Sequence, residues 1–207
     1  MIDIKKLLTD NGLSEYAIIP MPPEDKLIGR RVRARIPAGA KSVIVAVFPK
    51  HVPDDGSGRA NFARGEDYHE TAERMCVPVI DTLKAERGGV WEHFCDHSPF
   101  PEVALAQSAG LGVRGKNNIL ISRKYGTFCH ICEIVTDIEL PSEKRLLELP
   151  DLCKGCDKCI VACPTHNLPD FKKENCISYM TQKLKIPMHG WEWGCDICQE
   201  VCPWNIH

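Results

Sequence analysis

Apolar side chains repeat with two different periods along this chain. Residues 42–48 form an unbroken, β-branched apolar run that ends at Pro49, a pattern typical of a strand covered on both faces. Residues 2–8 instead place their apolar side chains at helical spacing. The stretch 67–86 also predicts a helix, which Pro78 would kink or split. Strand and helix patterns in one chain predict an α/β or α+β arrangement.

The rest of the chain predicts connections, a loop and further helices and strands. The proline-rich stretch 18–23 is expected to be an extended connection, because each proline removes a backbone donor. Residues 52–58 are polar and rich in turn formers, so they predict a loop. Residues 103–109 predict a helix of small side chains, and the apolar stretches 119–121 and 128–135 predict two more strands.

Composition and charge exclude several classes of protein. The 207 residues carry 26 basic and 28 acidic side chains, so no overall field would draw the chain onto nucleic acid or an anionic membrane. No run approaches the roughly 20 apolar residues of a membrane span, and the first residues do not resemble a signal peptide. We therefore expect a cytoplasmic protein without a membrane partner. A change of composition near residues 141–152 predicts two domains, 1–145 and 146–207.

Eight of the twelve cysteines lie between Cys153 and Cys202. The first group reads Cys-x2-Cys-x2-Cys-x3-Cys-Pro, and the second reads Cys-x2-Cys-x3-Cys-Pro after a lone upstream cysteine. In two-cluster ferredoxins, three closely spaced cysteines bind one cluster and the fourth crosses to the other. The spacing predicts two 4Fe-4S clusters, one bound by Cys153, Cys156, Cys159 and Cys202 and the other by Cys163, Cys176, Cys195 and Cys198.

Zinc is the competing metal, because four-cysteine zinc sites also use two-residue spacings. A run of three cysteines before x3-Cys-Pro suits a cluster better than a zinc site. The other cysteines are expected to be buried apolar side chains. Cys129 and Cys132 fall three apart on a predicted strand and would point to opposite faces. Cys76 and Cys95 are assigned the same buried role.

Residues 110–117 contain glycines in a GxGxxG arrangement. They follow a predicted helix and precede a predicted strand, the reverse of the context of a dinucleotide site, so the Rossmann interpretation is rejected. Glycines would equally let the backbone pass close to a flat ligand. Polar side chains also gather at 60–69 and near Asp96. Two interpretations fit them, a solvated helix start and a cleft edge that holds an acid, and the sequence does not choose between them.

Six motifs follow one another from about residue 40 onward. They are ARGEDYH at 63–69, DHSP at 96–99, AGLGVRGKN at 109–117, EIVTD at 133–137, CISY at 176–179 and GCDICQEVCPWN at 194–205. In the order and spacing of these motifs the chain resembles the epoxyqueuosine reductases, cobalamin-dependent iron-sulfur enzymes that complete queuosine synthesis in tRNA.

The resemblance implies a nitroreductase-like, cobalamin-processing α/β domain followed by a ferredoxin-like domain with two 4Fe-4S clusters, an α+β protein overall. It implies an oxidoreductase in which the clusters reduce a bound corrinoid and Asp96 acts as the general acid. An electron donor such as reduced flavodoxin or ferredoxin would feed the clusters, and tRNA would carry the substrate. The residues matched to the corrinoid pocket are Arg64, Asp67, Tyr68, His69, Gly110, Gly112, Gly115, Lys116 and Asn117.

Three departures from the family pattern leave other functions open. Val103 stands where the family usually has an arginine, and Val113-Arg114 replaces a Trp-Ile pair in the glycine segment. The chain also stops at His207, so we expect a short form without the family's additional C-terminal region. The alternatives are a corrinoid and iron-sulfur reductase of another small molecule or corrinoid, and a non-catalytic two-cluster electron-transfer protein.

Overall fold

The computed structural model describes residues 2–29, 31–143 and 151–205, which form two compact units. Unit 1 comprises Met1–Phe48, His69–Gly112 and His130–Leu149. Unit 2 comprises Pro49–Tyr68, Val113–Cys129 and Pro150–His207. Each unit is thus assembled from three separate segments. The boundary expected between residues 145 and 146 lies outside the described residues, and that division of the chain stays a prediction.

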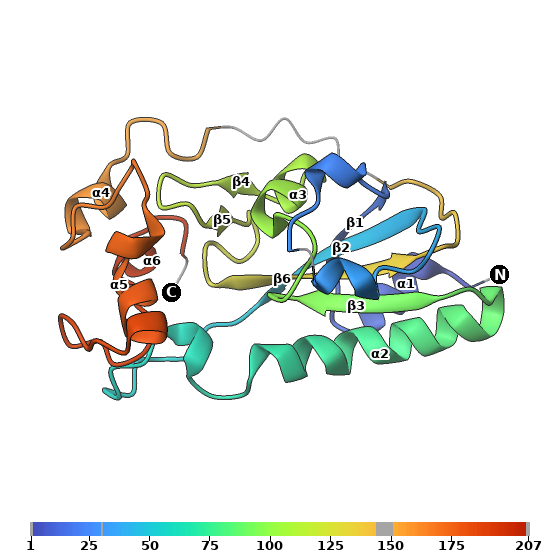
Figure 1. The fold of residues 1–207 in the computed structure, drawn as a ribbon, viewed down its shortest axis with the longest axis horizontal. Coiled ribbons are helices and arrows are strands. Elements are labelled where there is room, and N and C mark those ends of the chain that lie inside the picture. Colours follow the sequence, from blue (N-terminus) through green and yellow to red (C-terminus); the bar gives the residue numbers. More distant parts are fainter. Residues whose placement is uncertain (1, 30, 144–150, 206–207) are drawn as a thin grey trace. The chain divides into compact units, whose positions relative to one another are not determined.

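A four-stranded sheet forms the centre of unit 1, in the order β1-β2-β6-β3 (Figure 1). The edge strands β1 and β3 pair antiparallel with β2 and β6 respectively. Every residue from Ser42 to Phe48 in β2 is buried, which confirms the prediction of a strand covered on both faces. The strands span Glu15–Pro20 (β1), Ser42–Pro49 (β2), Trp91–Cys95 (β3) and Cys129–Thr136 (β6).

Three helices belong to this part of the fold, and two of them begin or end as the sequence suggests. The helix α1 (Ile4–Asp10) has Asp3 as N-cap and ends at Asn11, where that side chain also donates to the carbonyl of Leu7. The helix α3 (Glu102–Ser108) follows Pro101 and ends before Gly110, whose φ of 81° is the left-handed conformation usual after a helix. Short 3-10 turns occupy Glu24–Lys26 and Val32–Arg35.

The helix α2 (Tyr68–Arg87) runs along the sheet (Figure 1). Its buried residues Ala72, Cys76, Val79 and Leu83 recur at helical spacing, and Cys76 Sγ lies 3.9 Å from Cys132 Sγ of β6. Pro78 does not split the helix, contrary to one of the two predicted outcomes. It lies on the exposed side, where solvent can satisfy the carbonyl that loses its partner.

Two sequence expectations for unit 1 need correction. The stretch 18–23 was expected to be only a connection, but its first three residues complete β1. An edge strand tolerates Pro20 at its end because the missing donor faces no partner there. The strand β3 was not predicted, because Trp91–Cys95 alternates only weakly between apolar and polar side chains. Cys76, Cys95 and Cys132 are buried as expected, and Cys129 is half-buried.

Unit 2 is built from short elements. A two-stranded hairpin, β4 and β5, contains the second half of the glycine segment, from residue 113 onward, and α4 packs against α6. Cys159 lies on α4 and Cys163 follows it, Cys198 lies on α6, and Cys176 immediately precedes the short helix α5. The elements are Asn61–Ala63 (η3), Val113–Arg114 (β4), Leu120–Ile121 (β5), Lys158–Ala162 (α4), Lys173–Asn175 (η4), Ile177–Tyr179 (α5), the π-helix Met180–Leu184 (η5) and Ile197–Glu200 (α6). Within the described ranges, no helix combines the length and apolar content that crossing a membrane requires.

Candidate functional site

The cysteines of unit 2 gather in two sets of four. Cys153, Cys156, Cys159 and Cys202 line one small cavity together with Lys116. Burial raises the pKa of the Cys159 thiol, and the negative charges of Cys153, Cys156 and Cys202 raise it further. These four sulfur atoms are therefore close enough to act on one another electrostatically.

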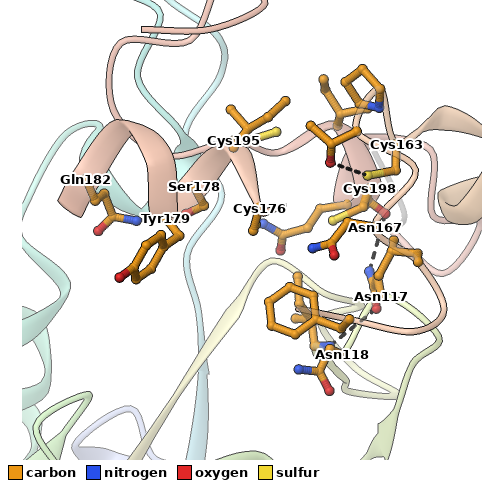
Figure 2. A pocket seen from close by; sticks show the side chains of 18 of the residues that line it. Asn117, Asn118, Cys163, Asn167, Cys176, Ser178, Tyr179, Gln182, Cys195 and Cys198 are labelled. Carbon is orange, nitrogen blue, oxygen red and sulfur yellow. Dashed lines mark hydrogen bonds between the residues drawn. The ribbon is translucent and has the colours of Figure 1, made fainter. Parts of the chain in front are cut away.

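The second set lines a larger cavity of about 430 Å³. Figure 2 shows Cys163, Cys176, Cys195 and Cys198 gathered in this cavity, with Asn117 on its other side. Burial raises the pKa of Cys195 to about 12, and the charges of Cys176 and Cys163 contribute to that rise. Each cavity thus contains the four cysteines that the sequence pattern assigns to one cluster.

The chemistry of both sets suits iron-sulfur clusters. All eight thiols are free of disulfides and half-buried. Burial raises the pKa of Cys159 and of Cys195, so without metal these two thiols keep their protons at neutral pH, and binding iron would release those protons. Cys198 of the second set also responds to the charge of Cys159 in the first, so the two sets lie near each other within unit 2.

A buried carboxylate next to Cys195 joins the cysteine segment to residues 49–68. Asp196 accepts hydrogen bonds from the backbone N–H of Asn61 and, at 3.2 Å, from the guanidinium of Arg64. Arg64 also pairs with Asp54 at 3.0 Å, and Gln199 donates to Asp196 at 3.0 Å. Arg64, assigned to a corrinoid pocket by resemblance, is therefore a buried partner of the cysteine turn here, and its predicted role stays a prediction.

The hairpin that carries the glycine segment makes similar contacts. Lys116 Nζ donates to the carbonyl of Cys156 at 2.9 Å and pairs with Asp157 at 2.7 Å. Asn117 Nδ2 donates to the carbonyl of Cys198 at 3.3 Å (Figure 2). Lys116 thus contacts the first cysteine set, and Asn117 contacts the second.

Asn205 makes a third such link and was not singled out from the sequence. Its side-chain oxygen accepts from the backbone N–H of Thr127 at 2.6 Å, and its nitrogen donates to the carbonyl of Gln199 at 2.6 Å. Gly126, with φ of 63°, lies so close that an added Cβ would come within 2.2 Å of the Asn205 oxygen. A buried asparagine just after the last Cys-Pro is a weak signal in the sequence, because only its partners reveal its role.

Asp96 and His69 meet in unit 1. His69 Nε2 lies 3.8 Å from Asp96 Oδ2, and both side chains are partly exposed. Asp96 has φ of 59°, a conformation that few non-glycine residues adopt, and Glu102 accepts a hydrogen bond from its backbone N–H at 3.0 Å. The structure therefore brings together two residues that the sequence assigned to a catalytic pocket.

The other residues assigned to the pocket have local structural roles as well. Tyr68 packs edge-on against Phe62, with ring centroids 6.4 Å apart. An added Cβ at Gly115 would lie 2.5 Å from Asn117 Oδ1, so this position needs glycine for close packing. Asp67 immediately precedes α2, and Gly112 is the last residue of its unit 1 segment. Their roles toward a corrinoid stay predictions.

Comparison with known proteins identifies the family. Residues 152–205 match the family described as "4Fe-4S double cluster binding domain". Over 191 residues the chain is 39% identical to an epoxyqueuosine reductase from Cyclobacterium marinum, and over 182 residues it is 37% identical to one from Leadbetterella byssophila. By these similarities, the chain belongs to the epoxyqueuosine reductase family. The alignments cover 81% of this chain but 59% of each relative's length.

Solved structures in the family share its fold. The chain aligns with an epoxyqueuosine reductase bound to an epoxyqueuosine-modified tRNA stem loop, with a TM-score of 0.78, 20% identity, and coverage of 98% of this chain and 64% of that one. A Bacillus subtilis epoxyqueuosine reductase, described with its catalytic aspartate loop swung out of the active site, aligns with a TM-score of 0.76 and 20% identity, over 98% of this chain and 64% of that one. A reductive dehalogenase described as B12-dependent aligns with a TM-score of 0.67 and 19% identity, over 99% of this chain and 32% of that one. The predicted α+β fold class is confirmed.

Proposed function

We propose that this chain is a corrinoid-dependent iron-sulfur reductase of the epoxyqueuosine reductase type. The observation that carries the proposal is that one chain contains both the two four-cysteine sets of unit 2 and the acidic turn of Asp96 in unit 1. The first can carry electrons and the second can carry a proton. Removing an epoxide oxygen as water, to leave a double bond, consumes two electrons and two protons, so the reaction needs both.

The two cysteine sets would act as the electron path. Cys153, Cys156, Cys159 and Cys202 hold one 4Fe-4S cluster, and the other set holds the second. The family likeness of residues 152–205 and the grouping of the sulfur atoms support this assignment. An external reductant, such as reduced flavodoxin or ferredoxin, supplies the electrons one at a time.

Asp96 would act on the leaving oxygen. Its carboxyl group is 60% exposed and lies beside His69, so it can reach a ligand bound over the turn and exchange its proton afterwards. His69 orients the carboxyl group through the pair at 3.8 Å. The loop described as catalytic in the Bacillus subtilis relative also centres on an aspartate, which supports this role.

A corrinoid would supply low-valent cobalt, which delivers electrons to a carbon-oxygen bond that clusters alone do not reduce. Its use is described for the reductive dehalogenase that shares this fold. The residues proposed to hold it are those assigned from the sequence: Arg64, Asp67, Tyr68, His69, Gly110, Gly112, Gly115, Lys116 and Asn117. The absence of disulfides among the described cysteines supports a reducing, cytoplasmic location.

The test is anaerobic reconstitution followed by turnover. Cluster-loaded protein is titrated with cob(II)alamin and followed by visible and electron paramagnetic resonance spectra, then given an epoxyqueuosine-containing tRNA stem loop and a chemical reductant. We expect corrinoid binding and queuosine formation. Asp96→Asn should lower the turnover rate by roughly 10²- to 10⁴-fold while leaving corrinoid binding intact.

The matched control is Asp81→Asn, which removes an exposed carboxylate from α2 and should keep the full rate. Full activity in Asp96→Asn would refute its role as the acid. A protein that binds no corrinoid under these conditions would refute the proposed chemistry.

A second candidate keeps the corrinoid and the clusters but changes the target. Val103 follows Glu102 where the family usually has an arginine, so a cation that could contact a substrate is missing. Corrinoid binding and reduction without any conversion of the tRNA stem loop would favour this candidate, in which a smaller molecule or another corrinoid accepts the electrons.

A further inference from the structure

The turn that carries Asp96 is held in a strained conformation. Asp96 has φ of 59°, and two tight three-residue turns follow one another, from His97 N–H to the Cys95 carbonyl at 2.7 Å and from Ser98 N–H to the Asp96 carbonyl at 2.7 Å. Left-handed backbone at a residue other than glycine persists only where its surroundings enforce it. The contacts of this turn therefore show what enforces it.

Glu102 provides such a contact from the first residue of α3. Its Oε1 accepts the backbone N–H of Asp96 at 3.0 Å, reaching back across Pro99 and Pro101. This bond fixes the backbone of Asp96 and leaves the carboxyl group of Asp96 directed to His69. The backbone and the side chain of the proposed acid are thus held by different partners.

The charge state of Glu102 depends on Asp96. Burial raises the pKa of Glu102 to about 7, and the negative charge of Asp96 contributes to that rise. The hydrogen bond from the Asp96 N–H favours the ionised form of Glu102 and therefore lowers this pKa, opposing the other two effects. Glu102 therefore changes its charge near neutral pH, which few carboxyl groups do.

The other titratable groups around this turn come from three elements. Glu133 on β6 is fully buried, and neither of its carboxylate oxygens has a hydrogen-bond partner among the described residues. Burial, and then the charge of Glu102, raise its pKa well above the usual range, although the nearby Ser98 hydroxyl opposes this.

Cys95 on β3 and Cys76 on α2 are buried thiols, and burial raises the pKa of Cys95. His69 on α2 faces Asp96. Glu102 is the half-buried carboxyl group placed to respond to Asp96 directly.

We propose that Glu102 is a positioning residue for Asp96, whose ionised carboxylate holds the strained turn and whose protonation loosens it. This rests on the proposed role of Asp96 as the acid. While Asp96 carries its proton, it has no charge to oppose ionised Glu102, and the charge-assisted bond to the backbone is strong. Once Asp96 has given that proton to the leaving oxygen, its negative charge draws a proton from solvent onto Glu102, and the turn is released until Asp96 is protonated again.

Hydrogen exchange of the Asp96 turn tests this without substrate or corrinoid. The probe is the peptide covering residues 95–101 in the cluster-loaded protein, at pH 6 and pH 8, with intrinsic rates corrected. We expect stronger protection at pH 8 than at pH 6. Glu102→Ala should exchange about ten-fold faster at pH 8, and Glu102→Gln, whose amide oxygen still accepts a hydrogen bond, should show protection that no longer changes with pH.

Two controls accompany this experiment. Glu73→Gln, on the exposed face of α2, should behave like the unaltered protein. Peptides from β2 must keep their protection in every variant, which separates a released turn from an unfolded unit. Equal protection of the turn at both pH values in the unaltered protein, or no loss of protection in Glu102→Ala, would overturn the proposal.

Turnover adds a second readout where the proposed function holds. Glu102→Gln should lower kcat more than it raises KM, and its rate should lose the change near pH 7 that the unaltered protein shows. An unaltered protein that turns nothing over but shows the pH-dependent exchange would refute the proposed function while supporting the positioning role of Glu102.

Discussion

The two units of this chain are stabilised in different ways. In unit 1 the interior is mostly apolar, with Glu133 as an exception: β2 buries seven consecutive residues, and Leu8, Leu83 and Phe94 are enclosed around the sheet. In unit 2 the enclosed side chains are mostly polar, including Arg64, Asn117, Asp196 and Asn205. Hydrophobic burial can stabilise the first, whereas the second depends on side chains that bond to the backbone of the cysteine turns and on the clusters themselves. Loss of iron should therefore affect the two units unequally.

The largest effect is expected from removing a cluster ligand. Cys195→Ala should lower the iron content from about eight atoms per chain to about four, because one of the two 4Fe-4S clusters is lost. Hydrogen exchange should show that residues 151–205 lose protection while the sheet of unit 1 keeps it. Iron and sulfide analysis and the exchange experiment measure both parts. Cys129→Ala, in β6, is the control and should keep all the iron. Stoichiometric zinc in the purified protein instead of iron would contradict the cluster assignment.

A core substitution should produce the opposite pattern. Phe48 is fully buried in β2, so Phe48→Ala should lower the free energy of unfolding of unit 1 by about 3–5 kcal/mol. Urea unfolding followed by exchange of β2 and β6 peptides measures this loss. Val90→Ala removes a side chain that is 55% exposed and should change the same free energy by less than about 0.5 kcal/mol. An equal loss in the two variants would show that the sheet does not form the core of the unit.

The stability of unit 1 should also depend on pH through its buried carboxyl groups. Folding raises the pKa of Glu102 from 4.5 to about 7, so the folded chain binds more protons than the unfolded chain between those values. The free energy of unfolding should therefore fall as the pH rises through that window, by up to about 3 kcal/mol from Glu102. Glu133 should add to this fall, because burial raises its pKa well above the usual range.

The matched variants are Glu102→Gln and Glu133→Gln, each of which removes one titrating group. Urea unfolding at pH 5 and pH 8 should show a smaller loss of stability with pH in either variant than in the unaltered protein. A pH dependence that both variants leave unchanged would mean that other groups cause it.

The smallest effect concerns the potential of one cluster. Lys116 places a positive charge beside Cys153 and Cys156, and Asp157 places a negative charge next to Lys116. Lys116→Met should make the reduction potential of that cluster more negative, since the added electron loses a favourable charge, and Asp157→Asn should make it more positive. Redox titration followed by electron paramagnetic resonance measures both shifts, with Lys84→Met on α2 as the control. Shifts of the same sign in the two variants would contradict this arrangement.

The sequence predicted unit 1 better than unit 2 for physical reasons. The buried run of β2 and the helical spacing of Ala72, Cys76, Val79 and Leu83 in α2 are local patterns, so they could be recognised one segment at a time. The cysteine spacing was equally local and predicted the two sets that the cavities contain. Strand β3 lacks such a pattern and was missed.

The contacts of unit 2 could not be found in this way. Asp196 bonds to Arg64 across 132 residues of sequence, and Asn205 bonds to Thr127 across 78. No periodicity records a bond of that kind, because neither partner differs from an ordinary polar residue until the chain has folded. The same holds for Glu102, whose bond to the strained Asp96 turn appears only in the structure.

The segmented make-up of unit 2 limits how this protein can be recombined. Residues 150–207 contain all the cluster-type cysteines, yet their turns are tied to side chains at 49–68 and 113–129. A gene fusion that exchanged only the C-terminal block between two relatives would leave Asp196, Asp157 and Asn205 facing foreign partners. We therefore expect a chimera to mature with both clusters only where the three segments keep matching side chains at these contacts.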